Sequence, residues 1–298
     1  MRPPARVALA EPVTDLPESG EYAFEQKLDG HRLLLGHQEN GPVVETGRTN
    51  RNVTAQYPEL AEAARGLPVG TILDGEGVVR LGQRFDFSSM QTRALSSPAK
   101  SARLPHDLPV RFVAFDVLTD GGRDLRSWPY HRRRDRLEGI VARYSDPLHL
   151  VEMTRDRRQA LSWLANEELA AQGVEGVLCK PWSQPYPAGR RGWLKVRPTQ
   201  PQDALAIGYT GRARAPARLV VDLGGEQGLA LSTPLTVELS HVLAQALIAS
   251  RTEQPPTTAL LGNVPYWLFT RPVPVEVDQG TTRHAATTIR RLRPDLAR

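Results

Sequence analysis

Tyr22-Ala23-Phe24-Glu25-Gln26-Lys27-Leu28-Asp29-Gly30-His31-Arg32 is the segment from which the fold can be read outward. Its first residues partly alternate between apolar and polar, as a strand does, and Asp29-Gly30 ends that strand. A second strand is expected from Arg32 to Gly36, a hairpin turn at Glu39-Asn40-Gly41 and a return strand from Pro42 to Thr46. The pattern predicts an antiparallel sheet that carries Lys27 near the end of one strand.

Lys27 and Asp29 are two residues apart, so in an extended segment their side chains share one face. A lysine amine can attack phosphorus when it is deprotonated, and burial or neighbouring cations lower its pKa enough to allow this. Gly30 lets the backbone turn or approach a ligand closely. The pattern Lys-x-Asp-Gly is nevertheless short, and a strand followed by an Asp-Gly turn produces it without any function in most proteins.

The composition is that of a globular protein of two domains. The chain has 298 residues, of which 40% are hydrophobic and 24% charged. It contains no apolar run long enough to span a membrane and no secretion signal, so no membrane partner is expected. Its single cysteine, Cys179, excludes an internal disulfide and a multi-cysteine zinc site, which fits a reducing cytoplasm. A net charge of +5 permits a polyanionic partner without requiring one.

Lysine is scarce in this basic chain. Of 38 basic residues only four are lysines, namely Lys27, Lys100, Lys180 and Lys195. Arginine stays protonated and cannot act as an amine nucleophile, whereas the pKa of a lysine can be lowered by its surroundings. The four lysines are therefore the first candidates for chemistry, although Lys100 lies in a Ser/Pro/Ala stretch that suggests chance retention.

Further elements follow from periodicity and turn residues. Helices are expected at 58–66, 129–143, 158–172 and 234–250, and a buried strand at 71–81, whose apolar run is interrupted by Asp74-Gly75-Glu76-Gly77. Arg197-Pro198-Thr199-Gln200-Pro201-Gln202 is the predicted linker between domains at 1–199 and 200–298. The other expected strands are 110–118, 175–180, 193–197, 204–209, 217–223, 228–232, 266–277 and 287–292.

Five other segments combine charged residues with glycine or an aromatic residue: Gly47–Asn50, Leu73–Val79, Phe112–Leu118 with Asp120-Gly121 and Asp124-Leu125-Arg126 after it, Glu175–Pro181, and Trp193–Arg197. Together with Lys27–Arg32, and in this order, they resemble the motifs of ATP-dependent DNA ligases and of the related RNA ligases and mRNA-capping enzymes. Each segment has an ordinary structural explanation when taken alone. Six coincidences in the right order are far less probable than one shared explanation.

The resemblance implies that Lys27 is the nucleophile that carries AMP and that Asp29 assists catalysis. It implies that Phe115 stacks on the adenine and that Glu175 and Glu76 hold Mg²⁺ or Mn²⁺, which needs few protein carboxylates when phosphates complete its shell. The implied nucleotide-binding residues are Gln26, Arg32, Arg48, Glu76, Phe115, Lys180, Lys195, Arg197, Arg291 and Arg293.

Two departures from the family pattern concern single residues. Arg197 stands where many ligases have a second lysine, and arginine still binds phosphate, often with two hydrogen bonds. The end of the chain, Arg283-His284 and Arg290–Asp295, resembles the final ligase motif, which often ends in Asp-Lys. Leu296 follows Asp295 here, which leaves Arg291, Arg293 and Asp295 as candidates. A basic tail that binds a polyanion without specificity is the alternative.

The resemblance implies an α+β fold. An adenylation (nucleotidyl-transferase) domain with antiparallel sheets and flanking helices would precede a small OB-fold β-barrel. The implied function is an ATP-dependent DNA ligase of the compact bacterial type that seals 5′-phosphate/3′-hydroxyl nicks through a covalent lysyl-AMP. The alternatives are an RNA ligase or capping-type guanylyltransferase, or a non-catalytic nucleic-acid-binding module.

The expected partners are nicked double-stranded DNA, ATP and end-joining or repair proteins. The protein is expected to be a cytoplasmic, nucleoid-associated monomer. The cluster Arg132–Arg136 invites a DNA-contact interpretation, but a solvated helix face is at least as good an explanation, so it is left out of the site.

Overall fold

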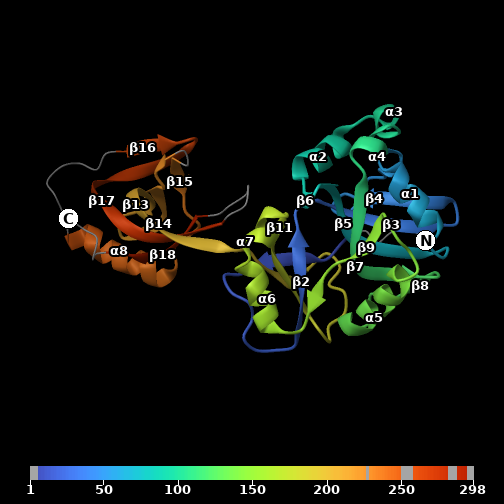
Figure 1. Ribbon diagram of the computed structural model, residues 1–298. Helices are drawn as coiled ribbons and strands as arrows, with labels where there is room; N and C mark the ends of the chain where they lie inside the picture. The colour runs from blue at the N-terminus through green and yellow to red at the C-terminus, as the bar shows by residue number, and fades with distance from the viewer. Residues whose placement is uncertain (1–5, 226–227, 250–257, 281–286, 294–298) are drawn as a thin grey trace. The chain divides into compact units, whose positions relative to one another are not determined.

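The computed structural model describes residues 6–225, 228–249, 258–280 and 287–293. Its contacts divide the chain into two compact units, Met1–Arg197 and Pro198–Arg298, and each is described by itself. Both contain antiparallel sheets with helices against them, so the expected α+β class is confirmed (Figure 1). Within these ranges no helix combines the length and the apolar character that a membrane span needs.

The larger sheet of the first unit follows the order β4-β3-β5-β7-β8, with β6 paired to β5 and β9 paired to β7. All its pairs are antiparallel except β7 with β9. Its strands are β3 (His31–Gln38), β4 (Gly41–Thr46), β5 (Thr71–Leu81), β6 (Arg84–Phe85), β7 (Val110–Asp120), β8 (Arg123–Asp124) and β9 (Leu148–Leu150).

The second sheet of this unit follows the order β1-β12-β11-β2-β10. Strand β1 runs parallel to β12, and the other pairs are antiparallel. Its strands are β1 (Leu9–Pro12), β2 (Tyr22–Leu28), β10 (Met153–Thr154), β11 (Val174–Pro181) and β12 (Arg191–Val196).

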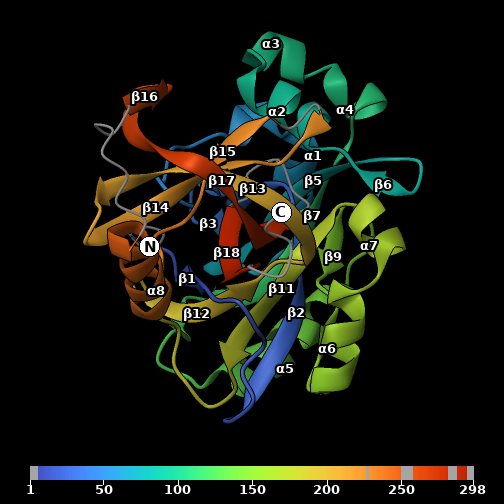
Figure 2. The ribbon, with the colours of Figure 1, turned by 90° about the vertical axis from the view of Figure 1, so that its left-hand side faces the viewer.

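The two sheets pack face to face, and helices cover their outer faces. In β3, Leu33 and Leu35 join the core under α1 and α5, whereas Leu34 points the other way, into a cluster with Trp193 of β12. Figure 2 shows α6 and α7 beside β2 and β11. The helices of this unit are η1 (Thr54–Gln56), α1 (Pro58–Arg65), α2 (Phe87–Leu95), α3 (Pro98–Ser101), α4 (Leu104–Asp107), α5 (Tyr130–Val141), α6 (Arg157–Leu164) and α7 (Glu167–Ala171).

The second unit is the small β-barrel with one helix that an OB-fold requires. Its sheet follows β15-β14-β13-β17-β16, with β18 also paired to β17. A bridge between Ser232 and Thr287 joins the end of β15 to β18 and brings the ends of the sheet together. Its elements are β13 (Thr199–Arg212), β14 (Ala215–Asp222), β15 (Leu229–Leu231), α8 (Val237–Ala249), β16 (Thr258–Leu261), β17 (Val264–Gly280) and β18 (Thr287–Leu292).

Long-range strand pairing accounts for one difference from the sequence-based expectations. The boundary between the units falls after Arg197, at the start of the predicted linker 197–202, but the rest of that segment is strand, because β13 begins at Thr199 and residues Thr199 to Asp203 pair with β17. The expected strand 71–81 is confirmed as the continuous strand β5. A Cβ at Gly75 would lie 2.5 Å from the Phe112 ring, so this glycine allows β5 to run close beside β7.

Local capping accounts for another difference. The single helix expected at 158–172 is wrong, because α6 ends at Leu164 and α7 begins at Glu167. The side chain of Asn166 accepts a hydrogen bond from the backbone N–H of Leu169 at 3.1 Å and starts the new helix. Helices α2, α3 and α4 had no counterpart in the expected elements, and they form the exposed extension after β6 (Figure 1).

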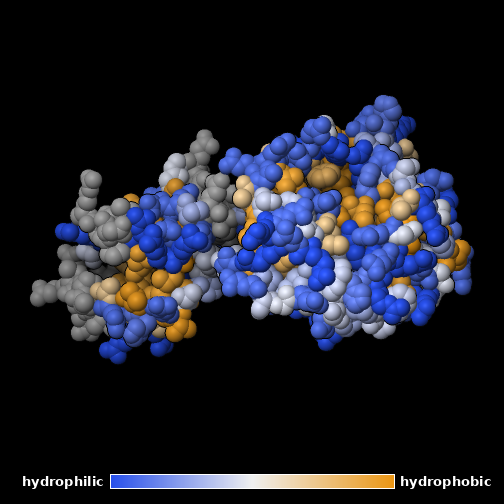
Figure 3. All heavy atoms as spheres, turned by 60° about the horizontal axis from the view of Figure 1, so that its bottom comes forward, coloured by the Kyte–Doolittle hydropathy of each residue, from blue (hydrophilic) through white to orange (hydrophobic). Residues whose placement is uncertain are grey.

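Hydrophilic side chains cover most of one face of the first unit, with smaller apolar areas between them (Figure 3). Such a surface is expected when few of the 38 basic residues are buried. A buried basic residue is therefore unusual, and its partners indicate why it is inside.

We expect Gly30→Ala to destabilise the first unit by about 2 kcal/mol or more, because the added carbon overpacks a close strand contact. A Cβ at Gly30 would lie 2.3 Å from the carbonyl oxygen of Gly77, which is backbone and cannot move aside cheaply. Gly139→Ala in α5 is the control, since a Cβ there meets nothing within 4 Å. Chemical denaturation should show the control neutral or stabilised by about 0.5–1 kcal/mol; equal losses in both would contradict the clash.

Candidate active site

The amine of Lys27 lies against a carboxylate of the neighbouring strand. Lys27 pairs with Gly176 in the β2–β11 ladder, and the ladder shifts register between Val174 and Gly176. This bulge brings Glu175 to Lys27, whose Nζ donates a hydrogen bond to Glu175 Oε1. The Lys27 side chain is 25% exposed and that of Glu175 8%, so the amine is reachable while the carboxylate is almost covered.

Several cations surround this pair. Arg197 Nη2 lies 2.7 Å from Glu175 Oε2, so one carboxylate is shared between Lys27 and Arg197. The pKa of Lys195 is lowered by burial and then by the charges of Arg197, Lys27 and, more weakly, Arg48, while Glu175 opposes the shift. Four cations and one acid therefore face a common space. Such a site favours a polyanion such as a triphosphate.

A second carboxylate lies beside Glu175. The pKa of Glu76 is raised to about 7 by burial; the charges of Lys27 and Arg32 reduce this shift, and those of Asp74 and Glu175 add to it. Glu76 is thus close enough to both Lys27 and Glu175 to sense their charges. Glu76 lies on β5, where it pairs with Arg32 in the β3–β5 ladder.

Glu76 and Glu175 fit the predicted magnesium site. The described residues contain no group of three or more His, Cys, Asp or Glu side chains that could hold a metal by themselves. Mg²⁺ is commonly bound by one or two carboxylates together with substrate phosphates and water. Two carboxylates that interact electrostatically, one of them with its pKa raised by burial, suit a cation that arrives with a nucleotide.

Arg32 is held deep between the two sheets. Its Nε donates to Asp74 Oδ1 at 2.9 Å and its Nη2 to Asp74 Oδ2 at 2.6 Å. Its guanidinium carbon lies 5.3 Å from the Phe115 ring centre and 5.4 Å from that of Trp193. Arg32 therefore forms part of the wall that surrounds the Phe115 ring.

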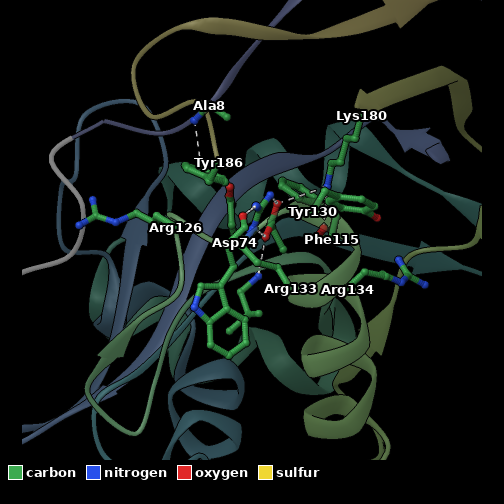
Figure 4. A network of polar contacts seen from close by, with 12 residues as sticks. Ala8, Asp74, Phe115, Arg126, Tyr130, Arg133, Arg134, Lys180 and Tyr186 are labelled. Carbon is green, nitrogen blue, oxygen red and sulfur yellow. Dashed lines mark hydrogen bonds and ion pairs between the residues drawn. The ribbon is translucent and has the colours of Figure 1, made fainter. Parts of the chain in front are cut away.

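Phe115 and Lys180 are in direct contact (Figure 4). Phe115 is half-buried and meets Trp193 edge-on at 6.0 Å. The Lys180 side chain has no exposed area; its Nζ donates to the Phe115 carbonyl at 2.6 Å and pairs with Glu25 Oε2 at 2.8 Å. Burial lowers the pKa of Lys180, and the charges of Glu25 and Asp116 oppose that shift. Lys180 was predicted to hold the nucleotide, and its ammonium lies instead against the strand that carries Phe115.

Two arginines of α5 belong to the same buried network, so a solvated helix face is wrong for them. Arg133 binds both oxygens of Asp116, at 2.7 and 3.0 Å, and Arg134 Nη1 lies 3.6 Å from Glu25 Oε1. Tyr130 OH donates to the same Glu25 oxygen. The helical spacing held a signal for this, because Arg133 is four residues before Leu137 and shares its buried face.

The remaining predicted residues are more dispersed. Gln26 alternates with Lys27 along β2, so its side chain lies on the opposite face of the strand. Asp29 directly follows β2, where its charge opposes the burial that lowers the pKa of His31. In the second unit, Arg291 pairs with Glu276 at 2.7 Å and Arg293 with Asp203 at 2.6 Å. Arg283, His284 and Asp295 lie outside the described residues.

Comparison with known proteins agrees with this arrangement. The family described as ATP dependent DNA ligase domain matches residues 8–197. The chain belongs to this ATP-dependent DNA ligase family. The matched residues include Lys27, Glu175 and Arg197, the members of the charge cluster that directly contact one another.

Mycobacterial DNA ligases are among the relatives of this ligase-family chain. DNA ligase C2 of Mycolicibacterium smegmatis is 33% identical over 209 residues, which are 70% of this chain and 57% of that protein, so the chain spans little more than half of that relative's length. The ligase domain of M. tuberculosis LigD is 27% identical, with a TM-score of 0.56, 98% of this chain covered and 95% of that one. A structure of mycobacterial DNA ligase D complexed with ATP and MES gives a TM-score of 0.52 at 27% identity and the same coverage.

Glu76 should make the stability of the metal-free protein depend on pH. Because its pKa is raised from 4.5 to about 7, the folded state keeps a proton that the unfolded state loses over that interval, so folding weakens as pH rises through it. Glu76→Gln should remove this loss and gain about 1–3 kcal/mol relative to wild type between pH 5 and pH 8. Urea denaturation at several pH values with EDTA measures it, with the exposed Glu39→Gln as control. Parallel profiles for wild type and Glu76→Gln would contradict the assignment.

Proposed function

We propose that this chain is an ATP-dependent DNA ligase that seals nicks with 5′-phosphate and 3′-hydroxyl ends, and that Lys27 carries the AMP. The observation that supports this most directly is the partly exposed Lys27 amine on Glu175, within a cluster of Arg48, Lys195 and Arg197. Residues 1–199 are the proposed adenylation domain and 200–298 the proposed OB-fold domain.

In the first step Lys27 Nζ attacks the α-phosphorus of ATP. A nitrogen–phosphorus bond forms, the bond to the bridging oxygen breaks, and pyrophosphate leaves with that electron pair. The amine must lose a proton, and Glu175 Oε1 is the acceptor already in contact with it. Lys195 and Arg197 stabilise the negative charge that builds on the phosphate oxygens.

The base and sugar of ATP occupy the space beyond the phosphates. The half-buried Phe115 ring stacks on the adenine, and Arg48 and Glu76 hydrogen-bond the ribose. Glu76 and Glu175 would hold Mg²⁺, which would supply charge neutralisation at the phosphates. Arg291 and Arg293 of the second unit are the proposed contacts to the leaving pyrophosphate.

The later steps transfer AMP to the 5′-phosphate at a nick and then join the strands. A phosphate oxygen of the nick attacks the phosphorus of lysyl-AMP and the Lys27 nitrogen leaves. The 3′-hydroxyl next attacks the activated 5′-phosphate and AMP leaves, and Asp29 is the proposed helper for this step. The same charge cluster serves each step, because each passes through a phosphorus centre that gains negative charge.

DNA is the substrate that the relatives favour over RNA or an mRNA cap, since DNA ligase C2 and ligase D are named for it. The structure of mycobacterial DNA ligase D is a complex with ATP, which favours ATP over GTP as the nucleotide of this chain. We further propose a cytoplasmic, nucleoid-associated monomer that acts on nicked double-stranded DNA, with repair or end-joining proteins as partners.

Incubation with ATP and Mg²⁺ should increase the intact mass of the protein by one AMP. Lys27→Arg should abolish the gain, because a guanidinium stays protonated and cannot attack phosphorus. Lys100→Arg makes the same change at an exposed lysine outside the site and should leave the adduct intact. The protein is first treated with pyrophosphate to remove any bound AMP. Its mass after incubation with ATP is then compared with its mass after incubation with GTP. A GMP adduct would favour a guanylyltransferase, and no adduct would favour a binding module.

Sealing of a nicked DNA duplex should require Lys27 and a 5′-phosphate. Lys27→Ala should reduce sealing in the presence of ATP to less than about a thousandth of wild type, since the proposed covalent intermediate forms on the Lys27 amine. DNA binding, measured by fluorescence anisotropy, should be unchanged. The same duplex with a 5′-hydroxyl should not be sealed, and sealing by Lys27→Ala would show that another residue is the nucleophile.

A further inference from the structure

The strand that carries Phe115 is held at two adjacent points. Lys180 Nζ donates to the carbonyl of Phe115 itself at 2.6 Å. The next residue, Asp116, receives Arg133 Nε at 2.7 Å and Arg133 Nη2 at 3.0 Å. One Asp116 oxygen also accepts the backbone N–H of Val117 at 3.0 Å, so this carboxylate is tied to its own strand. Movement of Arg133 must therefore move the backbone beside Phe115.

Arg133 is fully buried, and its other contacts fix where its guanidinium lies. Its Nη1 donates to the carbonyl of Trp128 at 2.5 Å and approaches that of Gln184 at 3.4 Å. Its guanidinium carbon lies 5.8 Å from the ring centre of Tyr130 and 5.6 Å from that of Tyr186. The arginine thus connects β7, the start of α5 and the segment before β12 (Figure 4).

Arg133 also borders a pocket that is partly open to solvent. This pocket has a volume of about 320 Å³ and is lined as well by Tyr130 and Trp193, and Trp193 is the residue that meets the Phe115 ring edge-on. Side chains that border a pocket can shift into it when a hydrogen bond is removed, since fewer neighbouring atoms oppose the movement. The position of the Phe115 ring consequently depends on directed bonds as well as on close packing.

We propose that Arg133 is a positioning residue for the purine-stacking ring of Phe115. Through its two bonds to Asp116 it sets the position of β7 at Phe115, together with Lys180 on the preceding carbonyl. Arg133 touches no substrate and acts through Asp116. This inference rests on the proposed function, because it assumes that Phe115 stacks on the base of ATP.

A purely structural role, in which Arg133 only joins α5 to β7, makes a different prediction. Arg136 also joins α5 to β7, through Asp120, and it lies three residues further along the same helix. Asp120 is four residues beyond Asp116 at the end of the strand. Arg136 is therefore the matched control, an ion pair between the same two elements that does not hold the Phe115 backbone.

The test measures the rate of lysyl-AMP formation against ATP concentration for wild type, Arg133→Lys, Arg133→Met and Arg136→Met. We expect the KM for ATP to rise about tenfold in Arg133→Met, the order expected when one aromatic stacking contact with a base is misplaced, with a much smaller change in the maximal rate. Arg133→Lys keeps the charge but loses the paired bonds to Asp116, so its KM should rise by a few fold. Arg136→Met should keep the KM of wild type.

Thermal unfolding shows whether each variant is folded. If Arg133→Met does not fold, the KM of Arg133→Lys decides the test. The proposal is overturned if folded Arg133→Lys and Arg136→Met both have the KM of wild type, or if the Arg133 variants lose maximal rate without a change in KM. Absence of AMP on wild-type protein would instead refute the proposed function. The two failures are thus distinguishable.

Discussion

The buried ion pair between Glu25 and Lys180 is the interaction on which the first unit depends. The two side chains are 1% and 0% exposed, and they lie on adjacent strands of one sheet, while Asp116 and Arg133 extend the network to the other sheet and to α5. Charges taken out of water are costly, and removal of one partner of such a pair costs about 3–5 kcal/mol. The carboxylates and cations must therefore be brought together for the unit to fold. Since Glu25 shares the face of β2 with Lys27, the network that fixes Glu25 also fixes the strand that carries the nucleophile.

Charge is used in two ways along β2. At Glu25 every charge is covered and paired, which gives a rigid interior. At Lys27, two residues further on, the charges are partly exposed and positive groups outnumber acids, which leaves the site ready for an anion. Three of the four lysines follow the same division, since Lys180 is buried whereas Lys27 and Lys195 are partly exposed. A compact ammonium suits both places, because it fits among three aromatic rings at Lys180 and can lose its proton at Lys27.

Much of the fold could be predicted locally, and the errors have a common cause. The strands around Lys27 and the hairpin at Gly41 follow from alternation and turn residues, and the structure confirms them. The predicted linker failed beyond its first residues because Pro201 suggested a break, whereas pairing with Asp278 of β17 keeps the segment extended. The cap at Asn166 is a local signal that was available and divides one predicted helix into two. Pairing between distant segments outweighs local preference wherever it provides backbone hydrogen bonds.

The sequence by itself determined the order of the motifs, the family they indicate and the choice of Lys27, because these depend on residue types at short spacing. Only the tertiary structure decided which charges are buried. Arg133 and Arg134 look like surface residues in a cluster of arginines, and Lys180 looks like a phosphate ligand in a motif strand. Their partners Asp116 and Glu25 lie far away along the chain and meet them only when the sheets and α5 pack together. Whether a charge faces water or a carboxylate is set by that packing, and no pattern within one segment contains it.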